Sequence, residues 1–145
     1  MSLITGCATQ GGQAEPALFL FAGGGADLLA GYRAWEVQLD THGNFSVAKN
    51  VRGDTEEFGP YVLTAAENRA MWDLIEEIRF DRLASSSRPG IPDEVKYVFK
   101  LHGEVGSPLI ELWAGEARQN VQLSKLIDQI RSLIEKYTGK RAILD

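Results

Sequence analysis

Hydrophobic and polar residues alternate along several segments of this chain, whereas in two other segments the hydrophobic residues recur about every 3.6 positions. Alternation places successive side chains on opposite faces of a β-strand, and the longer period places them on one side of an α-helix. The alternating segments predict two β-hairpins, one over 35–48 and the other over 95–113. The segments with the longer period predict an amphipathic helix after each hairpin.

Two further strands are predicted on shorter patterns. The apolar run 17–22 stops at Gly23-Gly24-Gly25, which is typical of a buried strand ended by glycines. Residues 58–63 predict one more short strand, and Pro60 confines it to a sheet edge or a strand start because proline has no N–H to donate. Residues 54–57, which precede it, are polar.

The two helices have clear boundary signals. The first begins after Thr64, where Thr64-Ala65-Ala66-Glu67 forms a capping box that satisfies two free backbone N–H groups. The second begins at about Leu123 and ends near Gly139, a residue suited to a left-handed cap. Each helix carries one hydrophobic stripe that should pack on the sheet: Met71, Leu74, Ile75 and Ile78 in the first, and Leu123, Leu126, Ile127, Ile130, Leu133, Ile134 and Tyr137 in the second.

These elements predict an α+β fold. Its antiparallel sheet has about four to five strands, built from two hairpins, with the two amphipathic helices packed on one face. The order along the chain is roughly β-β-β-(β)-α-β-β-α. We expect one domain over 17–145, preceded by a flexible segment over 1–16.

Composition and charge narrow the classes of function. The 145 residues, 44% of them hydrophobic, suit one domain. Fifteen basic against twenty acidic residues give a net charge of −5, so the field has the wrong sign for a nucleic-acid backbone. The single cysteine excludes an internal disulfide and a cysteine-based zinc site, and no apolar run approaches the ~20 residues of a membrane helix.

That cysteine belongs to the one motif that indicates a location. Ile4-Thr5-Gly6-Cys7 looks like the lipobox of bacterial lipoproteins, in which the thiol of the cysteine receives a diacylglycerol and the cysteine becomes the mature N-terminus. The next nine residues are rich in Gln, Gly and Ala and lack apolar periodicity, as in a tether. As a random coil they would span roughly 15 to 18 Å. We therefore expect lipid attachment at Cys7 and a domain held at the cell envelope, facing the periplasm or the exterior.

Two interpretations of this N-terminus stay open. An export signal has a basic start and an apolar stretch of ~7 to 15 residues, and only three residues precede the motif. In the favoured interpretation, a short leader stands in place of the export signal. In the alternative, the match arises by chance, Cys7 is an ordinary cysteine of a terminal segment and the protein is cytoplasmic.

No set of residues with catalytic or metal-binding spacing is recognisable. The glycines at 23–25 follow a strand but lack the Lys-Ser/Thr of a phosphate-binding loop, which favours a tight turn or bulge. His42 and His102 fall in predicted turns, without the spacing that places metal ligands on one helix face. Ser85-Ser86-Ser87 lacks the context of a nucleophilic serine, so a linker is the better interpretation. We predict no catalytic residue, no metal and no cofactor.

One surface is a candidate for partner binding. In the strand 109–113, alternation puts Ile110 and Leu112 on one face and Leu109, Glu111 and Trp113 on the other, so both faces carry apolar groups. If Ile110 and Leu112 face the helices, Leu109 and Trp113 lie on the open face as a patch for a partner. The alternative is that the run 17–22 or a long loop covers them.

The order of several of these motifs resembles a known family. Phe21-Ala22-Gly23-Gly24-Gly25-Ala26 at a strand end, Leu63-Thr64-Ala65-Ala66-Glu67 opening a helix, a tyrosine-bearing strand over 93–99 and a closing amphipathic helix are similar to emfourin-type domains. These are small bacterial inhibitors of thermolysin-like proteases. The similarity covers most of 17–137, but residues 40–59 depart from it, and no inhibitory motif can be carried over. The resemblance implies protease inhibition and assigns no site residue.

The sequence thus predicts a non-catalytic envelope lipoprotein domain that binds another protein. The first alternative is an emfourin-like inhibitor of a thermolysin-like protease. The second is an enzyme whose catalytic residues are distant in sequence and converge only in the fold. Partners are expected to be the membrane, through the lipid at Cys7, and an envelope protein, but no nucleic acid.

Overall fold

The computed structural model describes residues 17–27, 31–90, 94–102 and 108–142. Its elements in chain order are β1 (Ala17–Asp27), β2 (Gly31–Asp40), β3 (Asn44–Val51), β4 (Asp54–Val62), α2 (Ala65–Ile78), the 3₁₀ turn η2 (Phe80–Arg82), β5 (Val95–His102), β6 (Leu109–Trp113), α3 (Ala114–Gln119) and α4 (Val121–Thr138). Cys7, the rest of the predicted lipobox and the tether lie outside the described residues.

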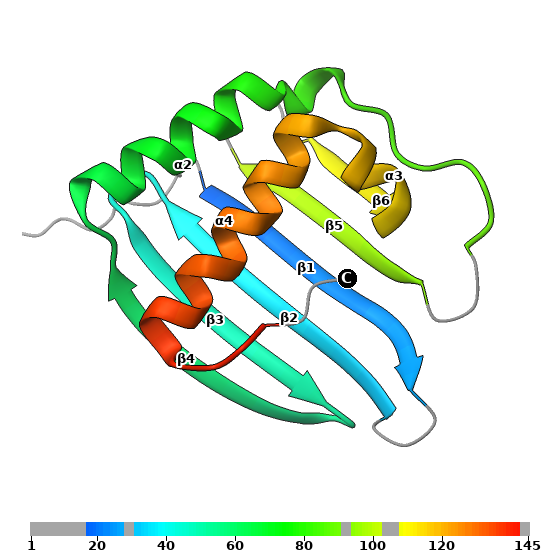
Figure 1. Cartoon of the computed structure of the whole chain (residues 1–145), viewed down its shortest axis with the longest axis horizontal. Helices are drawn as coiled ribbons and strands as arrows, with labels where there is room; N and C mark the ends of the chain where they lie inside the picture. The colour runs from blue at the N-terminus through cyan, green and yellow to red at the C-terminus, as the bar shows by residue number, and fades with distance from the viewer. Residues whose placement is uncertain (1–16, 28–30, 91–93, 103–107, 143–145) are drawn as a thin grey trace, which may run out of the picture.

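The six strands form one antiparallel sheet in the order β4-β3-β2-β1-β5-β6. The first strand of the chain, β1, therefore lies in the middle, between β2 and β5 (Figure 1). The helices lie on one face of this sheet, with α4 crossing the strands diagonally and α2 beside it (Figure 1). The predicted α+β class, the antiparallel sheet and the helices on one face are confirmed, and the sheet has six strands where four to five were predicted.

Two strands of the sheet, β1 and β4, are longer than predicted. Strand β1 runs through the glycines to Asp27, because Gly23 and Gly24 pair with β2 on one side and β5 on the other; the predicted stop at these glycines is wrong. Strand β4 begins at Asp54, four residues before the predicted start at Phe58, and its first residues are exposed. Polar residues can occupy this strand because an edge strand turns much of its surface to water.

The helix boundaries follow local chemistry. Thr64 Oγ accepts from the N–H of Glu67, and a carboxylate oxygen of Glu67 accepts from the N–H of Thr64, so the predicted capping box is present. Helix α4 begins at Val121 rather than near Leu123, because the side chain of Asn120 caps it by accepting from the N–H of Leu123. The six-residue α3 was not predicted, since it is too short to show a period.

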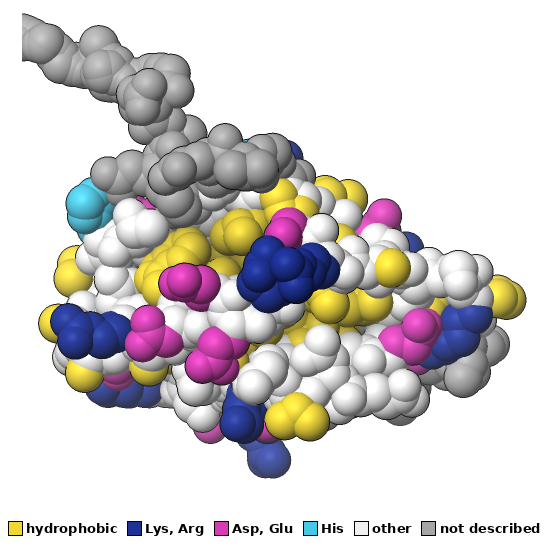
Figure 2. All heavy atoms as spheres, turned by 90° about the horizontal axis from the view of Figure 1, so that it is seen from above, with side chains coloured by type: hydrophobic (Ala, Val, Ile, Leu, Met, Phe, Trp, Pro, Cys, Tyr) yellow, Lys and Arg dark blue, Asp and Glu magenta, His cyan; other side chains and the backbone are white. Residues whose placement is uncertain are grey.

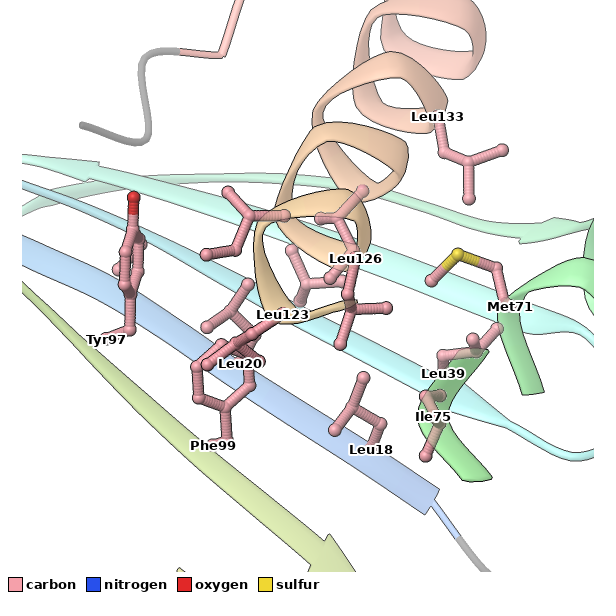
Figure 3. Packing of buried hydrophobic residues seen from close by; sticks show 14 of the residues in the cluster. Leu18, Leu20, Leu39, Met71, Ile75, Tyr97, Phe99, Leu123, Leu126 and Leu133 are labelled. Atoms are coloured by element: carbon pink, nitrogen blue, oxygen red, sulfur yellow. The ribbon is translucent and has the colours of Figure 1, made fainter. Parts of the chain in front are cut away.

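The core lies between the helices and the face of the sheet that they cover. Figure 3 shows Leu123 and Leu126 of α4 over Leu20 and Phe99 of the sheet. Both predicted helix stripes are buried except for Tyr137, which is partly buried against the same cluster. The strands contribute every second residue to it: Leu18, Leu20 and Ala22; Trp35, Val37 and Leu39; Phe45 and Val47; Tyr97 and Phe99; Ile110 and Leu112. This alternation leaves the other half of the strand residues on the opposite face.

The two edges of the sheet differ. On the outer side of β6, the N–H of Glu111 donates to Ser85 Oγ (3.0 Å), the N–H of Ser86 donates to Glu111 O (2.8 Å) and the N–H of Trp113 donates to Ser86 Oγ (3.1 Å). The serine-rich segment predicted as a linker thus covers this edge. Strand β4 forms the other edge and pairs only with β3 among the described strands.

Candidate binding face of the sheet

The face of the sheet that the helices leave open has an aromatic centre. In β1, Leu18 and Leu20 point into the core, so Phe19 and Phe21 point to the open face, where both are half-buried. Val98 of β5 pairs with Phe21 and is also half-buried. Three apolar side chains, Phe19, Phe21 and Val98, therefore lie together on the adjacent strands β1 and β5, on a face without a described helix above it. We call these three residues the aromatic centre.

The ring of Phe21 lies flat enough to cover its own strand. A Cβ added at Gly23 would come within 2.8 Å of the ring of Phe21 and 2.9 Å of the methyl group of Ala34. Gly23 pairs with Ala34, and the ring of Phe21 packs over this pair of small residues, so Ala34 is buried. Because glycine has no side chain and alanine only a methyl group, the aromatic ring can pack close to the backbone of the sheet.

Phe19 has a different neighbour. Its ring meets the ring of His102 edge to face, with the ring centroids 5.5 Å apart and an interplanar angle of 74°. His102 lies at the end of β5, opposite Ala17. The prediction that His102 is a solvated turn residue is therefore wrong. His102 is the last residue of β5, and its ring borders the aromatic centre.

Charged residues of opposite sign border the aromatic centre on its two sides. On the β2 side, Glu36 pairs with Phe21 and Gln38 pairs with Phe19. On the β5 side, Lys100 pairs with Phe19 and Lys96 pairs with Gly23. Glu36, Gln38 and Lys100 are exposed. The open face therefore has an acidic border along β2, formed by Glu36 alone, and a basic border along β5, formed by Lys96 and Lys100, with the apolar side chains of β1 between them.

The predicted patch of Leu109 and Trp113 lies on this same face, on β6, since Ile110 and Leu112 point into the core. Leu109 is 50% exposed. Trp113 is half-buried: its Nε1–H donates to the carbonyl of Arg88 (3.0 Å), and a Cβ added at Gly90 would lie 2.4 Å from its ring. Lys96 Nζ lies 5.1 Å from the ring centroid. The segment that contains Arg88 and Gly90 therefore covers Trp113 in part, while Leu109 remains exposed.

Apolar groups reach the surface elsewhere too. Figure 2 views the molecule from above Figure 1, and hydrophobic side chains gather in the middle of this view between acidic and basic ones. The large hydrophobic residues with the highest exposure are Val62 at 69%, Val121 at 66% and Leu109 at 50%. They belong to β4, α4 and β6 respectively, so the most exposed of them do not form one patch.

A second cluster has the most perturbed acid of the described residues, and it joins two helices. Glu67, at the start of α2, accepts hydrogen bonds from Lys136 Nζ and from the hydroxyl of Tyr137, both near the end of α4. The bond with Lys136 and then that with Tyr137 hold the pKa of Glu67 at about 2, well below its ordinary value of 4.5. The hydrogen bond that the hydroxyl of Tyr137 donates to Glu67 raises the pKa of Tyr137. A carboxylate that stays ionised and fully bonded suits a structural tie between helices better than proton transfer.

The other histidine, His42, is a solvated turn residue, as predicted. His42 lies exposed in the turn between β2 and β3, where its N–H donates to Asp40. Burial alone would raise the pKa of Asp40, but hydrogen bonds from Asn44 and His42 outweigh it and lower that pKa. Within the described ranges, no group of three or more His, Cys, Asp or Glu side chains is placed to hold a metal ion. Among the helices the structure describes, none has the length and apolar character to span a membrane.

The pattern that identifies the aromatic centre is present in the chain. Residues 17–22 are all apolar, so a strand there must turn Phe19 and Phe21 away from whichever face buries Leu18 and Leu20. The run itself predicts a buried strand, since continuous apolar runs are typical of strands covered on both faces. The helices that would decide between one covered face and two are remote in sequence, and only the fold places them all on one side.

No model of a known protein family matches the chain, and no curated protein matches its sequence.

Proposed function

We propose that this domain is a non-catalytic protein-binding module of the bacterial cell envelope and that it binds its partner through the open face of the sheet. The observation that carries the proposal is the aromatic centre formed by Phe19, Phe21 and Val98 on a face that no described helix covers. Apolar patches with a polar border are typical of protein interaction sites. Leu109, exposed on the neighbouring edge strand, extends the same surface.

A lipid anchor at Cys7 is the second part of the proposal and rests on the sequence motif. Multiple acyl chains hold a protein to a bilayer because each buried methylene contributes about 0.8 kcal/mol. The nine residues between Cys7 and the domain act as a tether. In this arrangement the membrane fixes the location, and the open face of the domain selects the partner.

Site-specific photo-crosslinking in the producing cell tests the binding face. A photoreactive amino acid replaces Gln38, an exposed residue that pairs with Phe19 on the open face. The matched control carries it at Glu77, an exposed residue of α2 on the helix side of the molecule. We expect a discrete covalent adduct with a protein from position 38 and none from position 77. Equal labelling from the two positions, or none from position 38, would contradict the proposal.

The anchor has its own test. Growth of cells that express the chain with its native upstream region in radiolabelled palmitate should label the protein, and Cys7→Ser should remove the label. Labelling that survives Cys7→Ser would rule out attachment at this cysteine.

A further inference from the structure

We propose that the partner of the open face is a second copy of this chain, and that two domains stack with their open faces together. This inference rests on the proposed binding face and names its occupant. Three properties of the face support it. They are the arrangement of its charged side chains, the absence of partners for the side chains of Glu36 and Lys100 among the described residues, and the size of the face.

The charges on the two strands beside β1 are complementary in sign, and Glu111, farther out on the same face, is paired with Lys96 of its own copy. Strand β1 is central, with Glu36 on the β2 side and Lys96 and Lys100 on the β5 side. A two-fold axis that lies in the interface and runs along β1 keeps the rows of paired residues in step and places β5 of one copy over β2 of the other. Homodimers with such an isologous interface are the commonest oligomers.

Under this symmetry the acidic border of each copy meets the basic border of the other. Glu36 belongs to the row of Phe21, Lys100 to the row of Phe19 and Lys96 to the row of Gly23. Because the row of Phe21 lies between the other two, Glu36 of one copy faces the gap between Lys96 and Lys100 of the other. Both contacts occur twice in the dimer, and Phe19 and Phe21 of the two copies meet along the axis.

Glu36 and Lys100 are free to make these contacts. Both are exposed, and neither side chain forms a hydrogen bond or an ion pair with another residue that the structure describes. Lys96, in contrast, already contacts Glu111 at 3.3 Å and lies over the ring of Trp113. Glu36 and Lys100 are therefore the pair that a second copy would complete, and Lys96 adds to the positive field around Glu36.

The size of the face is adequate for a dimer. With the axis along β1, strands β5 and β6 of one copy lie over β2 and β3 of the other, and β4 has no strand opposite it. Five strands about 4.8 Å apart and roughly seven paired residues long give a face of about 570 Å². Two such faces would bury about 1,100 Å², above the roughly 1,000 Å² that a specific interface should clear and at the low end of the range, so we expect a reversible dimer.

Charge reversal in analytical ultracentrifugation of the pure chain tests this inference. The wild type should sediment as a reversible monomer–dimer mixture that shifts to dimer with concentration. Glu36→Lys places lysine against lysine in the dimer, and Lys100→Glu places glutamate against glutamate. Each should raise the dissociation constant about tenfold, because two exposed pairs change from attraction to repulsion.

Mixing the two variants provides the decisive measurement. In the mixed dimer, the lysine introduced at position 36 of one copy meets the glutamate introduced at position 100 of the other. The unaltered pair of Glu36 and Lys100 forms on the second side, so association should return to the wild-type level. The matched control is Glu77→Lys, which makes the same charge change on α2 and should leave the dissociation constant unchanged. Circular dichroism of each variant verifies that it is folded.

Two results would overturn the inference: a wild type that stays monomeric up to millimolar concentration, or a mixture that associates no better than the separate variants. Neither result overturns the proposed function, because an adduct from position 38 with a different protein would still support the binding face after sedimentation had excluded self-association. An adduct of two copies of the chain supports both.

Discussion

The covered and the open face of this sheet are made by the same six strands, and their side chains differ in what surrounds them. On the covered face, Leu20, Phe99 and their neighbours pack against two helices and are almost wholly buried. On the open face, Phe19 and Phe21 are half-buried by small residues and by side chains of the adjacent strands. The first arrangement stabilises the fold, and the second holds apolar groups at the surface in fixed positions.

One strand thus serves two purposes with a single continuous run of apolar residues. Residues of a continuous apolar strand are not equivalent, because the loss of stability on removing a side chain depends on how many neighbours it had. Three measurements test this contrast between the faces and the contacts that hold the layers in place.

The largest contrast is expected between two phenylalanines in neighbouring strands. Phe99→Ala removes a ring that is 0% exposed and should lower the free energy of unfolding by about 3 to 5 kcal/mol, the usual range for a buried phenylalanine. Phe19→Ala, on the open face, should lower it by about 1 kcal/mol because its ring has few neighbours to lose. Urea unfolding of dilute protein measures both. Similar losses from the two variants would show that the open face is also part of the core.

The hydrogen bonds of Glu67 with Lys136 and Tyr137 join α2 to α4, and they should make the free energy of unfolding depend on pH. Because the pKa of Glu67 is about 2 in the folded protein and 4.5 ordinarily, its stabilisation is fully present above pH 4.5 and is lost as the pH falls toward 2. Glu67→Gln should lower the free energy of unfolding by about 1 to 2 kcal/mol at neutral pH, and this difference should shrink in acid.

A matched variant separates this tie from a general effect of charge. Glu76→Gln, at an exposed position of the same helix, removes one carboxylate without removing a bond between helices. It should change stability by less than about 0.5 kcal/mol. An equal loss in the two variants would mean that the contacts of Glu67 with Lys136 and Tyr137 contribute nothing specific.

The smallest effect is expected at the outer edge of β6, where Ser85 and Ser86 bond the backbone of the strand. Ser86→Ala removes the hydroxyl that accepts from the N–H of Trp113 and should cost about 1 kcal/mol, because that N–H is then left without its partner. Hydrogen exchange at the amide of Trp113 should become faster. Ser87→Ala, at the exposed neighbouring serine, should leave the exchange unchanged. Unchanged exchange in both variants would show that the loop does not protect this edge.

Local signals in the sequence predict much of the fold. The capping box at Thr64, the stripe from Met71 to Ile78 and the alternation in 95–101 depend on residues a few positions apart, and the structure confirms each of them. The stop predicted at Gly23 is wrong because pairing with two strands keeps glycines in a sheet, and those partners are remote in sequence.

The candidate site is predictable only in part, for the same reason. Alternation alone places Leu109 and Trp113 opposite Ile110 and Leu112, and the structure agrees. That the carbonyl of Arg88 bonds the indole of Trp113 depends on a loop path that no local pattern describes. The aromatic centre at Phe19 and Phe21 likewise depends on which face the helices take.

The place of β1 in the middle of the sheet has a consequence for synthesis. A chain made from its N-terminus completes β1 to β4 first, and until β5 emerges one side of β1 has no strand beside it. That side is an unpaired edge rich in apolar side chains, the kind of edge that promotes aggregation of incomplete chains. Pairing of β1 with β5 closes this edge, so a chain that ends before Val95 would keep it open.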